Sequence, residues 1–228
     1  MKIECVAAPG GAPLFETDLA HGEDPYHAVW LRGLTLTRVL EAERRADDIV
    51  LTVQGAPHRN VHLHPRRPRG LDPDVRLAPG ERPAVRQRIA AYAIVTSSRG
   101  LLGTQYSGLT HVDGQWGLPG GGVDPGEEPG DTVLREVVEE SSQRVRLGPL
   151  LDVQSDHWIG RAPRGQLEDF HAVRLVYGAH CDDPTDPVVI DVGGTTAAAT
   201  WMPLDRWDDL RWTTGTKALL KKHLLRHR

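Results

Sequence analysis

The most constraining feature of the sequence is a glycine-rich turn that runs directly into an amphipathic helix. The stretch from 121 to 143 reads GGVDPGEEPGDTVLREVVEESSQ. A helix has about 3.6 residues per turn, so positions i, i+3 and i+4 share one face. Glu136, Glu139 and Glu140 therefore lie side by side. The neighbouring arc predicts an apolar side that packs against the rest of the protein, formed by Val133, Leu134, Val137 and Val138.

Three adjacent carboxylates repel one another, and no lysine stands one turn away to relieve the repulsion. A hard divalent cation with oxygen ligands would relieve it. We therefore predict a metal site in which Glu136, Glu139 and Glu140 are ligands. The alternative is a solvated acidic face, which the adjoining glycine turn and Arg135 make less favourable.

The spacing in this stretch resembles the signature box of the Nudix hydrolases. That box is Gly, five residues, Glu, seven residues, Arg-Glu, an aliphatic, any residue, Glu-Glu, any residue, Gly and an aliphatic. The matching positions are Gly121, Glu127, Arg135, Glu136, Val137, Glu139 and Glu140. Each of these residue types has a background frequency of only several per cent, so a chance match of the whole pattern is negligible. The last two positions depart from it, with Ser142 in place of glycine and Gln143 in place of an aliphatic.

The resemblance implies an α+β fold, an α/β/α sandwich with a mixed sheet. It implies a hydrolase that cleaves the pyrophosphate link of a nucleoside diphosphate joined to another moiety, with Mg²⁺ or Mn²⁺ as cofactor. It also adds the backbone carbonyl of Gly121 to the metal ligands, and a homodimer is implied because many relatives form one. Glu139, Glu136, Arg135 and Glu127 are the predicted catalytic residues, with Arg135 pairing with Glu127 to brace the loop against the helix.

The departure at Ser142 affects the end of the helix rather than the ligands. In the family pattern the glycine follows the last helical turn, where a left-handed residue often ends a helix. Serine there is expected to cost some stability or to shift the helix end slightly. Activity should survive.

Outside the box, the candidates for substrate binding are Trp116, Tyr106, Glu168 and His171. The two aromatic rings would stack on a base, although packing in the core explains them equally well. Glu168 and His171, together with Asp169, lie where related enzymes often place an extra metal ligand or the base that activates water. An ordinary polar loop is the alternative for these three residues.

Secondary signals of two Nudix subfamilies are missing. His157 stands near the position of the proline that marks many ADP-ribose hydrolases, and the SQPWPFP string of the NADH pyrophosphatases is absent. Nucleoside triphosphates and nucleotide sugars are therefore the favoured substrates. One alternative is a Nudix-fold sensor that binds a nucleotide without turnover, which the intact carboxylates argue against. Another is an isomerase of prenyl diphosphates, for which no cysteine lies near the box.

The length of 228 residues suits one full domain and a smaller module. We predict a small N-terminal α+β module over 1–84, which includes a linker rich in proline, arginine and glycine at 65–83. The Nudix domain is predicted over 85–228. Within the module, Asp24 and Pro25 are typical of a helix start, and 26–46 allows a helix or a strand.

Alternating apolar residues predict further strands along the chain. They are expected at 48–54, 58–65, 88–96, 101–105, 115–123, 146–160, 169–180 and 196–204. Pro129 is expected to be the first residue of the box helix, and a final amphipathic helix is expected over 214–228. His58, His62 and His64 suggest a metal site, but a solvated polar strand face is favoured because no cysteine or acidic residue completes the ligand set.

Composition excludes several classes of function. Hydrophobic residues make up 39% and charged residues 25%, which is typical of globular proteins rather than disordered ones. A net charge of −4 gives no reason to expect general nucleic-acid or membrane binding. Cys5 and Cys181 form no CxxC pair, so we expect neither a disulfide framework nor a structural zinc site. With no apolar run typical of a signal peptide or of a membrane span, a cytoplasmic protein is predicted.

Overall fold

The chain forms two compact units in the computed structural model, which describes residues 1–58, 70–72, 75–110, 112–162, 165–191 and 194–224. Unit 1 consists of Met1–Ala90, Pro125–Pro129 and Asp152–Leu175. Unit 2 consists of Ala91–Asp124, Gly130–Leu151 and Val176–Arg228. The predicted division at 84/85 stays a prediction, and the contacts group 152–175 with the N-terminal residues.

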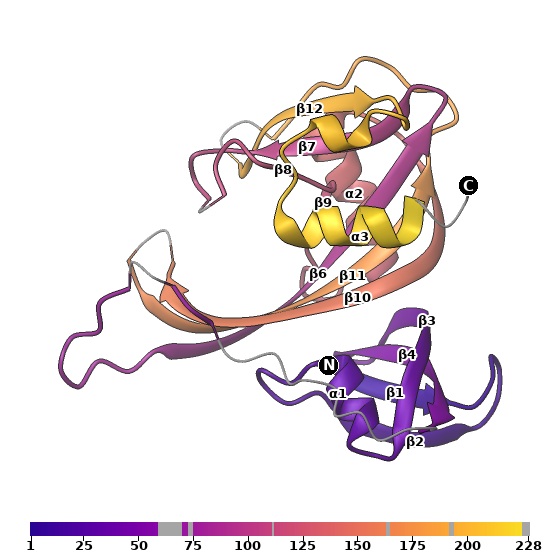
Figure 1. The fold of residues 1–228 in the computed structure, drawn as a ribbon, viewed down its shortest axis with the longest axis vertical. Helices are drawn as coiled ribbons and strands as arrows, with labels where there is room; N and C mark the ends of the chain where they lie inside the picture. Colours follow the sequence, from indigo (N-terminus) through magenta and orange to yellow (C-terminus); the bar gives the residue numbers. More distant parts are fainter. Residues whose placement is uncertain (59–69, 73–74, 111, 163–164, 192–193, 225–228) are drawn as a thin grey trace. The chain divides into compact units, whose positions relative to one another are not determined.

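A four-stranded mixed sheet with one short helix makes up the N-terminal part of unit 1 (Figure 1). Its strands follow the order β2-β1-β4-β3, in which β1 and β4 are parallel and the other two pairs are antiparallel. The elements are β1 (Lys2–Val6), β2 (Pro13–Asp18), α1 (Pro25–Trp30), β3 (Leu34–Arg45) and β4 (Asp48–Pro57). A small N-terminal α+β module is therefore present.

Local sequence explains the start and the end of helix α1. The side chain of Asp24 accepts a hydrogen bond of 2.8 Å from the backbone N–H of Tyr26, and Pro25 occupies the first turn. The predicted start is confirmed. Gly33 has a φ of 80°, a conformation that favours glycine, and the chain continues as the strand β3. The expected strand at 58–65, with His62 and His64, lies mostly outside the described residues.

An eight-stranded mixed sheet includes strands that run through both units. Its order is β12-β7-β6-β11-β10-β5, with β8 paired to β7 and β9 paired to β6. The strands are β5 (Gly70–Leu71), β6 (Ala84–Ser97), β7 (Gly100–Tyr106), β8 (Trp116–Gly117), β9 (Gly120–Gly122), β10 (Arg146–Arg161), β11 (Leu167–His180) and β12 (Thr196–Met202). Helix α2 (Pro129–Ser141) lies between β9 and β10 in the chain, and a 3₁₀ turn (Trp207–Asp209) and α3 (Thr214–Leu224) follow β12.

Helix α3 packs on the strands of unit 2 through an apolar cluster. Leu219 and Leu220 of α3 contact side chains from β6, β7 and β11, and Trp207 and Trp212 complete the cluster. Helix α2 buries Val133 and Val137 completely. In Figure 1, α3 lies in front of these strands and the paler α2 lies behind them. The predicted α+β fold with a mixed sheet is confirmed, and α2 begins at Pro129 as predicted.

The end of helix α2 shows why serine is accepted in place of glycine. Ser142 has a φ of 60°, the left-handed conformation that ends a helix, and its N–H donates to the Val138 carbonyl at 2.8 Å. The hydroxyl of Ser142 donates to the Val188 carbonyl at 2.6 Å. This bond connects the helix end to the segment that follows β11, so the strained residue gains a contact that glycine would lack.

Gln143 replaces the aliphatic residue of the box with a buried, fully bonded amide. Only 1% of Gln143 is exposed. Its Nε2 donates to the Ser141 carbonyl at 3.0 Å and to the Thr185 hydroxyl at 2.9 Å, while its Oε1 accepts from the Thr185 N–H at 3.0 Å. A buried amide is tolerated because its polar atoms have partners.

We expect Ser142→Gly to be more stable than Ser142→Ala by about 1 kcal/mol, because only glycine adopts φ near 60° without steric cost. Both variants lose the hydroxyl bond to Val188, so their difference isolates the effect of the Cβ atom. Urea unfolding of the two variants measures it. Equal stabilities would show that the left-handed residue carries no strain.

Candidate active site

The carboxylate face of helix α2 and the backbone of β9 meet within unit 2. A Cβ atom at Gly121 would lie 2.2 Å from Oε1 of Glu136, so only glycine lets the backbone approach this carboxylate. The approach brings a main-chain segment against an acidic side chain that is half-buried. This arrangement fits a divalent cation, which prefers carboxylate and carbonyl oxygens as ligands.

Arg135 neutralises part of the acidic face. Its Nη1 donates to Glu136 at 2.9 Å and to Glu139 at 3.1 Å, and its Nη2 donates to the Gly122 carbonyl at 3.4 Å. A third carboxylate, Asp124, lies 3.9 Å from the guanidinium. The guanidinium therefore connects the helix to the glycine-rich turn and lowers the repulsion between neighbouring carboxylates.

Glu140 is the buried member of the acidic face, with 8% of the residue exposed. One carboxylate oxygen accepts from the Gly120 N–H at 3.0 Å, and the other accepts from the Thr196 hydroxyl. Burial raises the pKa of Glu140 to about 7, although these two hydrogen bonds partly offset the effect. The side chain thus joins α2 to β9 and β12, and a nearby cation would favour its charged form.

Of the predicted metal ligands, Glu136 lies against the backbone at Gly121, and the full ligand set stays a prediction. Glu127 belongs to unit 1. The Glu127 carbonyl accepts from Nε of Arg44 at 2.9 Å, and the neighbouring Glu128 carboxylate accepts from the Arg44 N–H at 2.9 Å. Both contacts are within unit 1. The pairing of Glu127 with Arg135 stays a prediction.

Tyr106 and Trp116, the two aromatic residues predicted to contact substrate, lie on strands β7 and β8 in unit 2. Trp116 is half-buried and packs against the apolar cluster beneath α3. The Tyr106 ring lies against Gly117, where an added Cβ would be 2.6 Å from the phenolic oxygen. Packing within the protein accounts for much of the burial of both side chains, and a role in base stacking stays a prediction.

Glu168 and His171 are both buried in unit 1. Glu168 accepts from Arg86 at 3.2 Å. The two ring nitrogens of His171 lie 2.9 Å from Nε2 of Gln87 and 2.9 Å from the Ser155 hydroxyl. Burial lowers the pKa of His171 to about 4, so the imidazole is neutral at pH 7. Their predicted roles at the substrate stay predictions.

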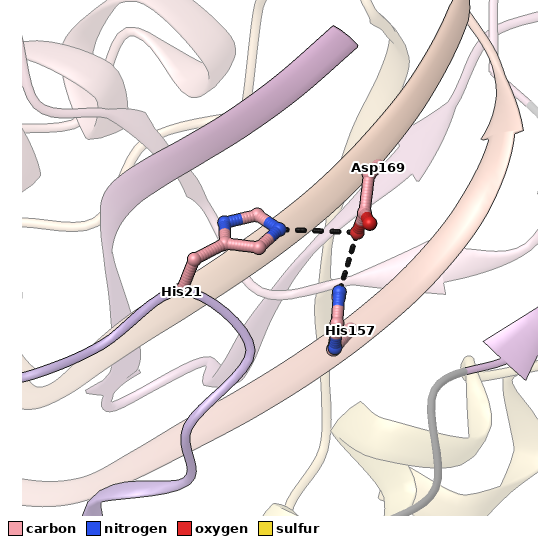
Figure 2. A group of neighbouring side chains, drawn as sticks. All are labelled: His21, His157 and Asp169. Carbon is pink, nitrogen blue, oxygen red and sulfur yellow. Dashed lines mark hydrogen bonds and ion pairs between the residues drawn. The ribbon is translucent and has the colours of Figure 1, made fainter. Parts of the chain in front are cut away.

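Sequence reasoning missed a second group of polar side chains, in unit 1. His21 and His157 both contact the carboxylate of Asp169 (Figure 2). The sequence predicts Asp169 only together with Glu168 and His171, as an extra metal ligand or a base, and it links neither His21 nor His157 to them. His21 is separated from Asp169 by 148 positions, so no local spacing could have pointed to the group.

Comparison with known proteins decides the family. A family model described as the NUDIX domain matches residues 86–222, which is more than half of the chain. The chain belongs to the Nudix family. Over 125 residues it is 36% identical to an RNA pyrophosphohydrolase of Rhodopseudomonas palustris (strain BisB18), a match that covers 48% of this chain and 69% of that protein. A second RNA pyrophosphohydrolase, from Azorhizobium caulinodans, is 35% identical over 122 residues, covering 48% and 68%.

Other Nudix proteins match over shorter or more divergent stretches. Diphosphoinositol polyphosphate phosphohydrolase 2 of Rattus norvegicus is 54% identical over 39 residues, or 17% of this chain and 22% of that protein. The MutT NUDIX hydrolase from Burkholderia pseudomallei aligns with a TM-score of 0.47 and 28% identity, over 60% of this chain and 98% of that chain. The chain is a Nudix-type pyrophosphohydrolase. Among its described residues, no helix has the length and apolar character needed to cross a membrane.

Gly121→Ala tests the close approach of backbone and carboxylate in the Nudix box. The added Cβ displaces the end of the Glu136 side chain rather than backbone, so we expect a nearly unchanged melting temperature. Turnover should fall by about 100-fold, because a displacement of about 1 Å at a catalytic group costs that much. Gly108→Ala is the matched control, since its nearest atom would lie 3.9 Å away. Equal activity of the two variants would contradict this role for Gly121.

Glu140→Gln tests the cost of the buried carboxylate. Glutamine keeps an oxygen for the Gly120 N–H and places an amide against the Thr196 hydroxyl, which is able to accept. Without divalent cations at pH 8, the variant should melt at or above the temperature of the wild-type protein, because it buries no charge. Thermal melts in a chelating buffer measure this, and a clear loss of stability would show that the carboxylate stabilises the fold.

Proposed function

We propose that this Nudix enzyme hydrolyses the pyrophosphate link of a nucleoside diphosphate joined to another moiety, with a divalent cation as cofactor. Nucleoside triphosphates and nucleotide sugars are the favoured substrates. The observation that carries the proposal is the close approach of the Gly121 backbone to the Glu136 carboxylate, on the helix that also carries Glu139 and Glu140. These four residues would hold Mg²⁺ or Mn²⁺.

Each side chain has a distinct part in this function. Glu139 is the most exposed of the three carboxylates, with 41% of its side chain accessible, so it is the ligand that reaches furthest toward solvent. Arg135 holds Glu136 and Glu139 in place and limits their mutual repulsion. A bound Mg²⁺ or Mn²⁺ would neutralise phosphate oxygens, orient the group for in-line attack and acidify the attacking water.

Two features support the proposed location and the proposed class of substrate. Cys5 and Cys181 are buried and form no disulfide with each other, which supports the proposed cytoplasmic location. The net charge of −4 supports a small nucleotide rather than general nucleic-acid binding. The homodimer proposed from the family resemblance is tested by the oligomeric state of the purified protein.

A substrate panel tests the reaction directly. Metal-stripped enzyme is supplied with Mg²⁺ or Mn²⁺ and assayed on nucleoside triphosphates, UDP-glucose, ADP-ribose and 5′-triphosphorylated RNA. The RNA is included because the relatives are RNA pyrophosphohydrolases. We expect release of phosphate or pyrophosphate from a nucleotide only when a cation is present. Tight nucleotide binding without any product would instead support a sensor.

Glu139→Gln tests the need for charge at the proposed metal site. Glutamine keeps the size of the side chain, so we expect turnover at saturating Mg²⁺ to fall by about 100-fold to 1000-fold, which corresponds to about 3–4 kcal/mol of lost electrostatic stabilisation. Glu127→Gln should cost less, because the part proposed for Glu127 is to brace the site and not to hold the cation. Asp131→Asn is the control, since it removes one exposed charge from the first turn of the same helix. Wild-type turnover in folded Glu139→Gln would overturn the proposed ligand set.

A further inference from the structure

Two imidazoles and one carboxylate converge within unit 1 (Figure 2), and none of them belongs to helix α2. Oδ1 of Asp169 lies 3.0 Å from Nε2 of His21 and 2.5 Å from Nε2 of His157. All three candidate ligand atoms lie within 4.8 Å of one another. Their side chains are mostly buried, with 25%, 16% and 11% exposed for His21, His157 and Asp169.

The fold fixes this convergence from three separate segments. His157 lies on β10 and Asp169 lies on the neighbouring strand β11. His21 arrives from the turn between β2 and α1, and the next residue, Gly22, has a φ of 74°. A Cβ at Gly22 would lie 2.3 Å from Nδ1 of His157. Glycine at this position therefore lets the turn approach the imidazole closely.

Both imidazoles present Nε2 to the same carboxylate oxygen of Asp169. Nδ1 of His21 is buried and has no hydrogen-bond partner in the part of the chain that the structure describes, so the polar contact of this ring is through Nε2. The His171 ring stands behind the group, with ring centroids 5.6 Å from His21 and 5.9 Å from His157. Hydrogen bonds with Gln87 and Ser155 hold His171 in place.

We propose that His21, His157 and Asp169 form a binding site for a divalent transition metal, with Zn²⁺ as the best-fitting ion. Imidazole nitrogens suit Zn²⁺, Fe²⁺ and similar ions, whereas Mg²⁺ prefers oxygen ligands alone. Ligand bonds of about 2.0–2.2 Å in a tetrahedral Zn²⁺ site place the ligand atoms roughly 3.3–3.6 Å apart. The observed separations need only small movements to reach that spacing.

The proposed ion would have a structural consequence for unit 1. It would join the turn that follows β2 to strands β10 and β11, which lie more than a hundred positions further along the chain. Binding to the folded state alone stabilises that state. With three protein ligands, a further coordination position remains for water, so the site also has the composition of a catalytic zinc centre.

Metal titration of the full-length protein tests the proposal. Metal-stripped protein is titrated with Co²⁺ and then Zn²⁺ in the presence of excess Mg²⁺, which occupies oxygen-rich sites. We expect one equivalent of Co²⁺ with visible d–d bands, displaced by Zn²⁺, in the wild-type protein and in Glu139→Gln. X-ray absorption of the zinc-loaded wild-type protein should show imidazole ligands. At a Zn²⁺ concentration of about 100 times Kd, the melting temperature should rise by about 5 °C or more.

Matched variants test whether His157 and Asp169 are ligands of the bound metal ion. His157→Asn and Asp169→Asn should each weaken Zn²⁺ binding at least 10-fold, because even the loss of a residue that only supports a metal ligand typically costs about 10-fold in affinity. His180→Ala, which removes an exposed histidine of unit 2, should bind as the wild-type protein does. Absence of imidazole ligation in the wild-type protein would overturn the proposal whether or not the variants fold. Unchanged Zn²⁺ affinity in folded His157→Asn and Asp169→Asn would overturn it as well, leaving a hydrogen-bonded histidine–aspartate group.

Discussion

The repulsion among three carboxylates on one face of α2 is the constraint on which the rest of unit 2 depends. Each glutamate meets it differently. Glu136 lies against the backbone at Gly121, Glu139 shares the Arg135 guanidinium with Glu136, and Glu140 is buried between the Gly120 N–H and the Thr196 hydroxyl. The protein therefore places backbone and hydroxyl dipoles and the Arg135 guanidinium around the acidic face, and the proposed divalent ion would balance the remaining charge.

Sequence reasoning located the elements whose determinants are local. Pro129 begins α2 as predicted, and Val133 and Val137 are fully buried, because a helical period and a proline at the first turn act over a few residues. Strands β1 and β2 were not predicted, since Gly and Pro punctuate the first 23 residues and hide the alternation. Whether 26–46 forms helix or strand was settled only by tertiary context, in which β3 pairs with β4.

The candidate site divides in the same way. Residues of the box are close in sequence, so helical spacing alone places Glu136, Glu139 and Glu140 on one face of α2. The group of His21, His157 and Asp169 has no such signal, because its members come from a turn and two strands far apart in sequence. Alternation along β11 does place Asp169 and His171 on one face of the strand. Only the fold, however, shows that the turn carrying His21 lies beside Asp169.

The departures from the Nudix box show how a pattern can change while the helix that carries it keeps its place. Serine in the left-handed position forms a bond to Val188 that glycine could not form, and Gln143 satisfies the backbone N–H and the hydroxyl of Thr185 from inside the protein. Both contacts reach the segment that follows β11. That segment also donates from Ile190 to the carbonyl of Glu139 at 2.8 Å. Ser142 and Gln143 therefore both bond the end of α2 to the segment that follows β11. These bonds hold the helix end in place without the glycine and the aliphatic residue of the common pattern.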